Sequence, residues 1–377
     1  MKHMKFLSFF LGVTFSIVAC SSNNEIIPVP DVDPDGDDGT TEVEFAKGAD
    51  IGWVTEYESK GYNFYNAKGE QRECTALMKE LGLNAIRIRV WVDPSKHGNW
   101  CNTADVVEKA KRAKELGMDV MIDFHYSDWW ADPAQQNKPA SWVGKNLANL
   151  KSAIKDHTVS VLQALKTIGV IPKWVQVGNE IRPGMLWDED VALSGASYNV
   201  TEKDLKDAPA SATDKVVYPM NWANLGAFVT TGYDAVKSVF PDAIVIVHLD
   251  NGWDSGLFTW FFDELKKNGG KWDMIGMSLY PYWSRDAKEG YSSADAVITD
   301  CISNIKALST KYNCDVMVVE TGMECADDNG KLASNSVLNE GKRQLARILK
   351  ECKENTNGRC KGGFYCCLLY TSDAADE

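Results

Sequence analysis

Two glutamates end apolar, strand-like segments in this 377-residue chain. Glu180 ends the stretch WVQVGNE, whose alternating residue types are typical of a β-strand. Glu320 follows DVMVV, and strict alternation would place Val316 and Val318 on its face. One such glutamate is usually a solvated acid. Two carboxylic acids at the ends of different strands, however, favour paired-carboxylate chemistry, as in the hydrolysis of glycosidic bonds.

Other polar side chains fall at the same kind of position. Arg87 and Arg89 lie two residues apart and therefore share one face of a predicted strand. A buried arginine is costly unless a carboxylate pairs with it, and the nucleophile of the site could be that partner. His125 and His248 end two further strands, and Asp50 lies on the first strand. A lone histidine is more often structural, but two at strand ends favour a role in the site.

These residues lie on segments that alternate between strand and helix from Lys47 onward. Eight strands in this alternation predict a single (β/α)8 TIM barrel, in which strand ends carry the chemistry. The expected strands are 49–53, 85–92, 119–124, 174–177, 243–249, 274–279, 316–319 and 363–365. The expected helices are 75–81, 104–116, 147–168, 222–240, 257–267, 294–311 and 341–350.

Composition narrows the class of protein. The formal net charge of −13 argues against nucleic acid as a partner, because phosphate backbones need clustered lysine and arginine. Thirteen tryptophans mildly favour a carbohydrate binder, since aromatic faces stack on sugar rings, although most tryptophans pack in cores. No spacing of cysteine or histidine predicts a zinc site.

The N-terminal segment predicts export. A charged start and the apolar stretch 6–18 are typical of a signal peptide, and the run before Cys20 resembles a bacterial lipobox. We expect residues 1–20 to be the lipoprotein signal, with lipidation at Cys20, and residues 21–44 to be a disordered acidic tether. The barrel would then occupy residues 45–365. The expected location is the outer membrane or cell surface of a bacterium, with the lipid as the only membrane contact.

Seven motifs, taken together and in order, resemble glycoside hydrolase family 53. They are GADIGW (48–53), IRVWVDP (88–94), DFHYSDWWADP (123–133), QVGNEIRPGMLW (176–187), HLDNG (248–252), SLYPYW (278–283) and VVETG (318–322). This family comprises the arabinogalactan endo-β-1,4-galactanases, retaining (β/α)8 hydrolases. The resemblance implies an exported, lipid-anchored enzyme, expected to be a monomer, that cleaves pectic β-1,4-galactan.

The resemblance also implies roles for individual residues. Glu180 would act as general acid and then general base, and Glu320 as the nucleophile, held by an arginine such as Arg89. Asn179 would bind the 2-hydroxyl of the sugar. The remaining implied substrate contacts are Asp50, Trp91, His125, His248, Asn251, Tyr280 and Trp283.

Two features of the C-terminal third depart from a simple match. In some relatives the loop after strand seven binds calcium, and Glu324, Asp327, Asp328 and Asn329 could ligate it here. We expect a solvated turn instead, and the chemistry requires no cofactor. After Tyr365 the match to the family stops. We expect a barrel truncated at strand eight, followed by a non-native tail over residues 366–377.

Two alternatives remain open at this point. A related retaining enzyme could cut another β-1,4-linked polysaccharide, such as mannan, xylan or glucan. A non-catalytic, glycan-binding surface lipoprotein on the same barrel is the other, although both glutamates and their neighbours are present.

Overall fold

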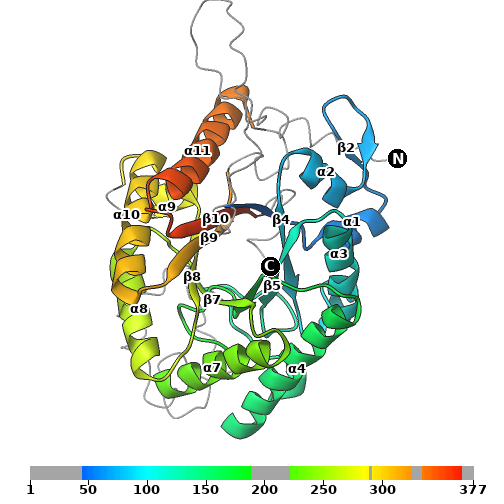
Figure 1. Cartoon of the computed structure of the whole chain (residues 1–377), viewed down its shortest axis with the longest axis vertical. Helices are drawn as coiled ribbons and strands as arrows, with labels where there is room; N and C mark the ends of the chain where they lie inside the picture. Colours follow the sequence, from blue (N-terminus) through cyan, green and yellow to red (C-terminus); the bar gives the residue numbers. More distant parts are fainter. Residues whose placement is uncertain (1–44, 134, 188–220, 288–290, 324–332, 367–377) are drawn as a thin grey trace, which may run out of the picture.

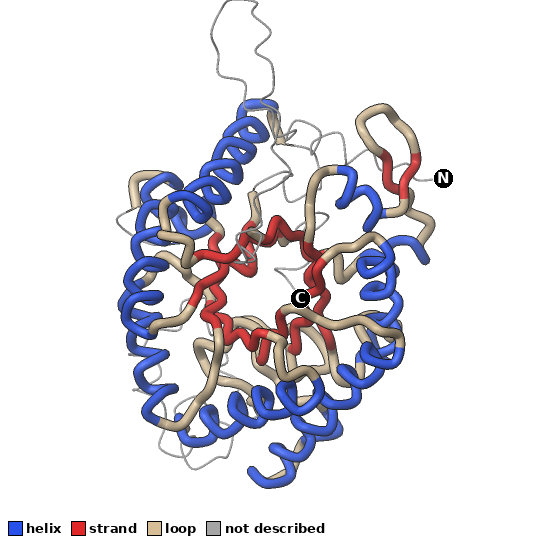
Figure 2. Tube along the Cα trace, in the orientation of Figure 1, coloured by secondary structure: helices blue, strands red, loops and turns tan. Residues whose placement is uncertain are grey.

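The computed structural model describes residues 45–133, 135–187, 221–287, 291–323 and 333–366. Eight parallel strands form a closed barrel in the order β1-β10-β9-β8-β7-β6-β5-β4. Helices surround this ring, as Figures 1 and 2 show. The predicted (β/α)8 fold is therefore confirmed.

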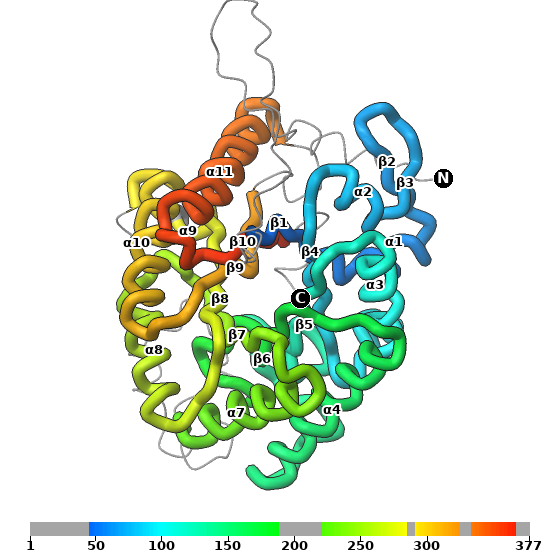
Figure 3. Tube along the Cα trace, viewed as in Figure 1, coloured from blue at the N-terminus to red at the C-terminus, as the bar shows by residue number. Residues whose placement is uncertain are grey.

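The bounds of the elements follow the predicted alternation. The barrel strands are β1 (Ala46–Asp50), β4 (Ala85–Val90), β5 (Asp119–Phe124), β6 (Trp174–Val177), β7 (Ile244–Leu249), β8 (Met274–Leu279), β9 (Asp315–Thr321) and β10 (Cys360–Tyr365). The helices of the outer layer are α1 (Val54–Ser59), α2 (Cys74–Glu80), α3 (Thr103–Glu115), α4 (Leu147–Thr167), α7 (Trp222–Val239), α8 (Ser255–Lys267), α9 (Pro281–Ala287), α10 (Ala294–Tyr312) and α11 (Asn335–Glu354). Figure 3 traces this order around the ring.

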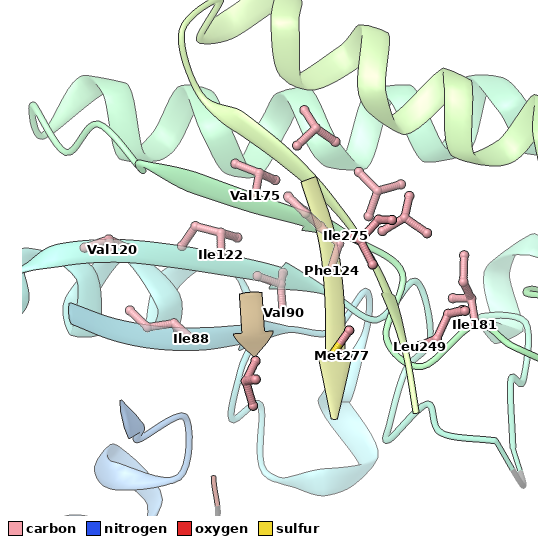
Figure 4. Close-up of a cluster of buried hydrophobic side chains, with 14 of the residues drawn as sticks. Ile88, Val90, Val120, Ile122, Phe124, Val175, Ile181, Leu249, Ile275 and Met277 are labelled. Atoms are coloured by element: carbon pink, nitrogen blue, oxygen red, sulfur yellow. The ribbon is translucent and has the colours of Figure 1, made fainter. Parts of the chain in front are cut away.

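Strand alternation divides the apolar residues into two cores. Outward side chains such as Ile88, Ile122 and Ile275 pack against the helices and belong to the larger core (Figure 4). Inward side chains, among them Trp174 and Phe364, fill the barrel itself. Because successive residues point to opposite faces, the inward positions nearer the strand ends remain for polar residues.

Strand β9 breaks this alternation where it matters most. Met277 of β8 pairs with Val318, but the next residue, Ser278, pairs with Glu320, so β9 carries one extra residue. Such a β-bulge re-aims the side chains that follow it. Val316 and Val318 consequently lie in the outer core, whereas Glu320 forms an ion pair with Arg87 inside the barrel. The prediction that Glu320 shares the face of these two valines was wrong.

Other boundaries differ from the predictions by a few residues. Strand β1 covers Ala46–Asp50, because the apolar residues from Ile51 onward form the turn into α1 and are buried there. Helix α11, which follows its Ser334 cap and ends at Glu354, is ten residues longer than the predicted segment, counting both ends. The short hairpin of β2 (Phe64–Tyr65) and β3 (Gln71–Arg72) was not predicted. Among the described helices, none is long and apolar enough to cross a membrane.

One packing feature predicts how stability depends on pH. His157 on α4 lies edge-on to Phe124, Tyr126 and Trp142, and its Nε2 is buried with no hydrogen-bond partner among the described residues. Burial lowers the pKa of His157 from 6.5 to about 4. The unfolded chain therefore binds the proton more tightly, and stability is lost as the pH falls below 6.5.

The variant His157→Phe removes this titration. We expect it to be more stable than the wild type by about 2 kcal/mol at pH 5, with a smaller difference at pH 7, in urea unfolding. A difference of the same size at both pH values would mean that packing alone, rather than protonation, separates the two proteins.

Candidate active site

Arg87 of β4 is the centre of a buried polar cluster inside the barrel mouth. Its Nη1 donates to Asp50 Oδ2 at 2.9 Å, and its Nη2 lies 2.8 Å from both Asp123 Oδ2 and Glu320 Oε1. The same Nη2 donates to Asn179 Oδ1 at 2.8 Å. A single guanidinium thus joins strands β1, β4, β5 and β9 to Asn179, which lies two residues after β6. A buried arginine is tolerated here because several carboxylates surround it.

Glu320 is the carboxylate of this cluster that opens toward the barrel mouth. It is 8% exposed, whereas Asp123 is fully buried. The hydroxyl of Tyr280 donates to Glu320 Oε2 at 3.0 Å. Burial raises the pKa of Glu320, and the negative charges of Asp123 and Asp50 add to this, while Arg87 and the Tyr280 hydroxyl lower it. Arg87 and Tyr280 therefore favour the ionised form, which a nucleophile requires.

Glu180 reaches the same space from the end of β6. Its backbone has a left-handed φ of 48°, which is uncommon for a residue other than glycine. Gly178, two residues earlier, has a φ of 83°, and a Cβ there would lie 2.5 Å from Ile181. This turn directs the Glu180 carboxylate to Ser278 of β8, whose hydroxyl donates to Oε1 at 2.5 Å.

The surroundings of Glu180 hold it in the acid form. Burial raises the pKa of Glu180 well above its ordinary value, and the negative charges of Glu320, Asp250 and Asp132 raise it further. The Ser278 hydrogen bond acts in the opposite direction. One carboxyl that favours its proton therefore faces another whose arginine and tyrosine favour ionisation. This difference is the one that an acid and a nucleophile need.

The two histidines lie behind these carboxylates. His125 accepts a hydrogen bond from the backbone N–H of Ala131 at Nδ1, and its Nε2 is 3.0 Å from Asp123 Oδ2. His248 is fully buried, with Nδ1 2.9 Å from Gln176 Nε2 and Nε2 2.8 Å from Ser278 Oγ. Burial, together with the Arg87 charge, lowers the pKa of His248 well below its ordinary value, so this ring is neutral.

Two of the predicted contacts, Arg89 and Trp91, lie next to each other. The guanidinium of Arg89 is 4.2 Å from the ring centroid of Trp130 and 5.2 Å from that of Trp91. Its Nη1 is 3.6 Å from Asp50 Oδ1. Trp91 is only 2% exposed and packs against Trp129, so a sugar would meet Trp129 and Trp130 before it. The ion pair with Glu320 is made by Arg87, which replaces Arg89 as the predicted partner of the nucleophile.

The other predicted contacts divide by exposure. Asp50 is 2% exposed, and besides Arg87 it accepts the backbone N–H of Gly52. Asn179 is buried, and its amide nitrogen donates to the carbonyl of Ala131 at 2.7 Å. Asn251 follows β7 with a φ of 53°. Trp283 on α9 is 41% exposed, the largest exposure among the predicted contacts.

Several residues of the site were not assigned from the sequence. Ser278 had no signal beyond its motif, and Gln176 was taken only as part of an alternating strand. Arg182 and Asp250 form a buried ion pair with two contacts of 2.8 Å. Strand-end position could have indicated Asp250, but the pairing with Arg182 depends on the turn after β6. The loop that was expected to be a solvated turn rather than a calcium site, Cys20, the tether and residues 367–377 lie outside the described residues. No group of three or more potential metal ligands occurs in the described part of the chain.

Comparisons with known proteins agree with this geometry. The model of glycosyl hydrolase family 53 matches residues 46–357. An arabinogalactan endo-β-1,4-galactanase of Thermothelomyces thermophilus is 32% identical over 281 residues, which are 73% of each chain. An endo-β-1,4-galactanase of Bacillus subtilis is 28% identical and aligns over 85% of this chain and 69% of its own. A solved fungal β-1,4-galactanase superimposes with a TM-score of 0.68 at 28% identity, over 85% of this chain and 88% of its own.

Proposed function

The chain belongs to glycosyl hydrolase family 53 and is a glycoside hydrolase, and we propose that it cleaves internal β-1,4-galactosidic bonds of pectic (arabino)galactan with retention of configuration. The observation that carries this proposal is the pair of mouth carboxyls, Glu180 and Glu320, within a galactanase-like barrel. Burial and neighbouring acids raise the pKa of Glu180 well above its ordinary value, whereas at Glu320 the contacts with Arg87 and Tyr280 act against the rise that burial causes. The galactanase names of the relatives supply the substrate class.

In the first step, Glu320 attacks the anomeric carbon of galactose and forms a covalent glycosyl ester. The bond to the leaving oxygen breaks, and Glu180 gives its proton to that oxygen. Arg87 and Tyr280 position the attacking carboxylate and favour its ionised form. Glu180 is then ionised and ready for the second step.

In the second step, Glu180 takes a proton from water, and the resulting hydroxide displaces Glu320 from the anomeric carbon. Both carboxyls return to their starting protonation states. We propose that Asn179 binds the 2-hydroxyl of this galactose. His125 and Asp50 act through Asn179 and Arg87, because the polar atoms of both side chains already bind other groups of the same chain. The exposed Trp283 would contact an adjoining sugar, whereas the buried Arg89 and Trp91 would act through Trp129 and Trp130, against which they pack.

Product analysis on linear galactan tests this function, with mannan, xylan and carboxymethylcellulose alongside. Short galacto-oligosaccharides from galactan alone, released first as the β-anomer in NMR spectra, are expected. Turnover of another of these polymers would keep the two-carboxyl mechanism and reject the substrate. Binding of galactan without turnover by the folded protein would instead support a glycan-binding role.

We also propose that Cys20 is lipidated and anchors the enzyme as a monomer to a bacterial membrane. The lipobox-like run before Cys20 supports this proposal. Expressed in a bacterium that processes lipoproteins, the wild type is expected to incorporate radiolabelled palmitate and to sediment with membranes. Cys20→Ser should abolish both, while Cys74→Ser, at a buried cysteine of the barrel, should leave the label in place. Equal labelling of the wild type and Cys20→Ser would reject lipidation at Cys20.

A further inference from the structure

His248 is connected to Glu180 and to its neighbour Ile181 by three contacts. Its backbone carbonyl accepts the N–H of Ile181 at 3.1 Å, and its Nδ1 lies 3.4 Å from the backbone nitrogen of Glu180. Its Nε2 is 2.8 Å from Ser278 Oγ, which in turn donates to Glu180 Oε1. The ring of His248 thus contacts the backbone of Glu180 directly and its carboxyl through the Ser278 hydroxyl.

The chemistry of these groups fixes where the protons lie. The hydroxyl of Ser278 has one hydrogen, and it is donated to Glu180. Ser278 Oγ must therefore accept from His248, which places the hydrogen of the neutral ring on Nε2. Nδ1 is then an acceptor, as required by the amide of Gln176 at 2.9 Å and the N–H of Glu180.

Two further contacts support this tautomer. The Gln176 amide is oriented by its own Nε2, which donates to Asp123 Oδ1 at 2.6 Å, and by its oxygen, which accepts from Arg87. Asn179 Oδ1 lies 3.0 Å from His248 Nδ1 and could favour the other tautomer. That oxygen, however, already accepts from Arg87 at 2.8 Å.

We propose that Ser278 and His248 are positioning residues that keep Glu180 Oε1 as a hydrogen-bond acceptor and so confine the transferable proton to Oε2. The proposal rests on the proposed function, in which Glu180 is the acid. An Oε1 that already accepts the Ser278 hydrogen is a poor site for a second one. The carboxyl is also prevented from rotating, so Oε2 carries the proton that the leaving oxygen receives.

The same hydrogen bond affects the pH at which Glu180 loses its proton. The charged groups that face Glu180 are Glu320 from β9, Asp250 after β7 with its partner Arg182, and Asp132 in the loop after β5. Burial and these three acids raise the pKa of Glu180, and the Ser278 hydroxyl lowers it. Removing the hydroxyl should therefore move the deprotonation of Glu180 to higher pH.

The test is the pH profile of kcat/KM on linear galactan for Ser278→Ala. We expect the alkaline limb to move to higher pH by about one unit, because the ionised form of Glu180 loses a hydrogen bond. Below that limb kcat should fall by about 10-fold, because the freed carboxyl rotates. KM should be unchanged, since Ser278 is only 2% exposed. Ser278→Thr keeps the hydroxyl and should restore the wild-type limb.

Tyr280→Phe is the matched control. It also removes one hydroxyl that hydrogen-bonds a site carboxyl, but that carboxyl is Glu320. Its loss should raise the pKa of Glu320 and so move the acidic limb, rather than the alkaline limb, to higher pH. An alkaline limb of Ser278→Ala at the wild-type position would overturn the proposal.

A second measurement does not depend on the substrate. Because the folded-state pKa of Glu180 is raised, the stability of the protonated form is lost as the pH rises through that pKa. The loss should be larger in Ser278→Ala, so its melting temperature should fall further below the wild type at pH 9 than at pH 5. A constant difference would reject the proposal. If the wild type cleaves no galactan, the proposed function fails, and this measurement still decides the role of Ser278.

Discussion

Glu320→Gln is expected to lower kcat on linear galactan by at least about 10⁴-fold, with retained binding of galacto-oligosaccharides. Glutamine cannot form the glycosyl ester, yet its amide oxygen can still accept from Arg87, while its amide nitrogen takes the place of Oε2 and can donate to the Tyr280 hydroxyl. Steady-state kinetics and calorimetric titration with galactotetraose would measure the two quantities. Glu115→Gln, an exposed glutamate at the end of α3, is the matched control and should leave both unchanged.

The stability of Glu320→Gln provides an independent check. The folded-state pKa of Glu320 is raised, so its contribution to stability is complete at low pH and is lost as the pH rises through that pKa. Glutamine does not titrate. The variant should therefore be at least as stable as the wild type at pH 8, by thermal unfolding. An inactive variant that melts well below the wild type would indicate a structural role for Glu320 instead.

Glu180→Ala is expected to lower kcat on galactan by about 10³-fold, because both protonation of the leaving oxygen and activation of water are lost. An aryl galactobioside with a dinitrophenolate leaving group needs no proton, so the formation of its glycosyl ester should be nearly normal. Azide, an anionic nucleophile that needs no base, should enter the space left by alanine and accelerate turnover.

The configuration of the azide product decides which glutamate has which role. Attack on the ester of Glu320 gives the β-galactobiosyl azide, and NMR spectroscopy identifies the anomer. An α-azide from Glu180→Ala would mean that azide had replaced the nucleophile, and the two roles would have to be exchanged.

The sequence predicted the strands most accurately where alternation and burial coincide. The bounds of β5, β6 and β8 match the predicted segments. Strand β1 was placed three residues too late, because buried apolar residues in the turn after Asp50 resemble a strand. The prediction for helix α11 was too short, because most residues near its two ends are polar. Its start depends on the Ser334 cap rather than on periodicity.

Site residues were predictable in type but not in depth. Arg87 and Arg89 share one face, and only the height of each residue in the closed barrel decides which of them meets Glu320. Likewise, the motifs included Ser278, but its contact with Glu180 depends on the left-handed turn at the end of β6. Spacing along one strand carries no information about how far a neighbouring strand is shifted along the barrel axis.

Because of the extra residue in β9, the reactivity of this barrel depends on the number of residues in the strand as well as on their types. Up to Val318, odd-numbered side chains such as Met317 point inward; one added residue reverses the phase, and an even-numbered glutamate reaches Arg87. Deletion of Val319 would remove the bulge, and the glutamate, now directly after the outward-facing Val318, would still point into the barrel by strict alternation. In a strand of this length, the β-bulge therefore sets the direction of the Glu320 side chain, and a substitution at any single position would leave that direction unchanged.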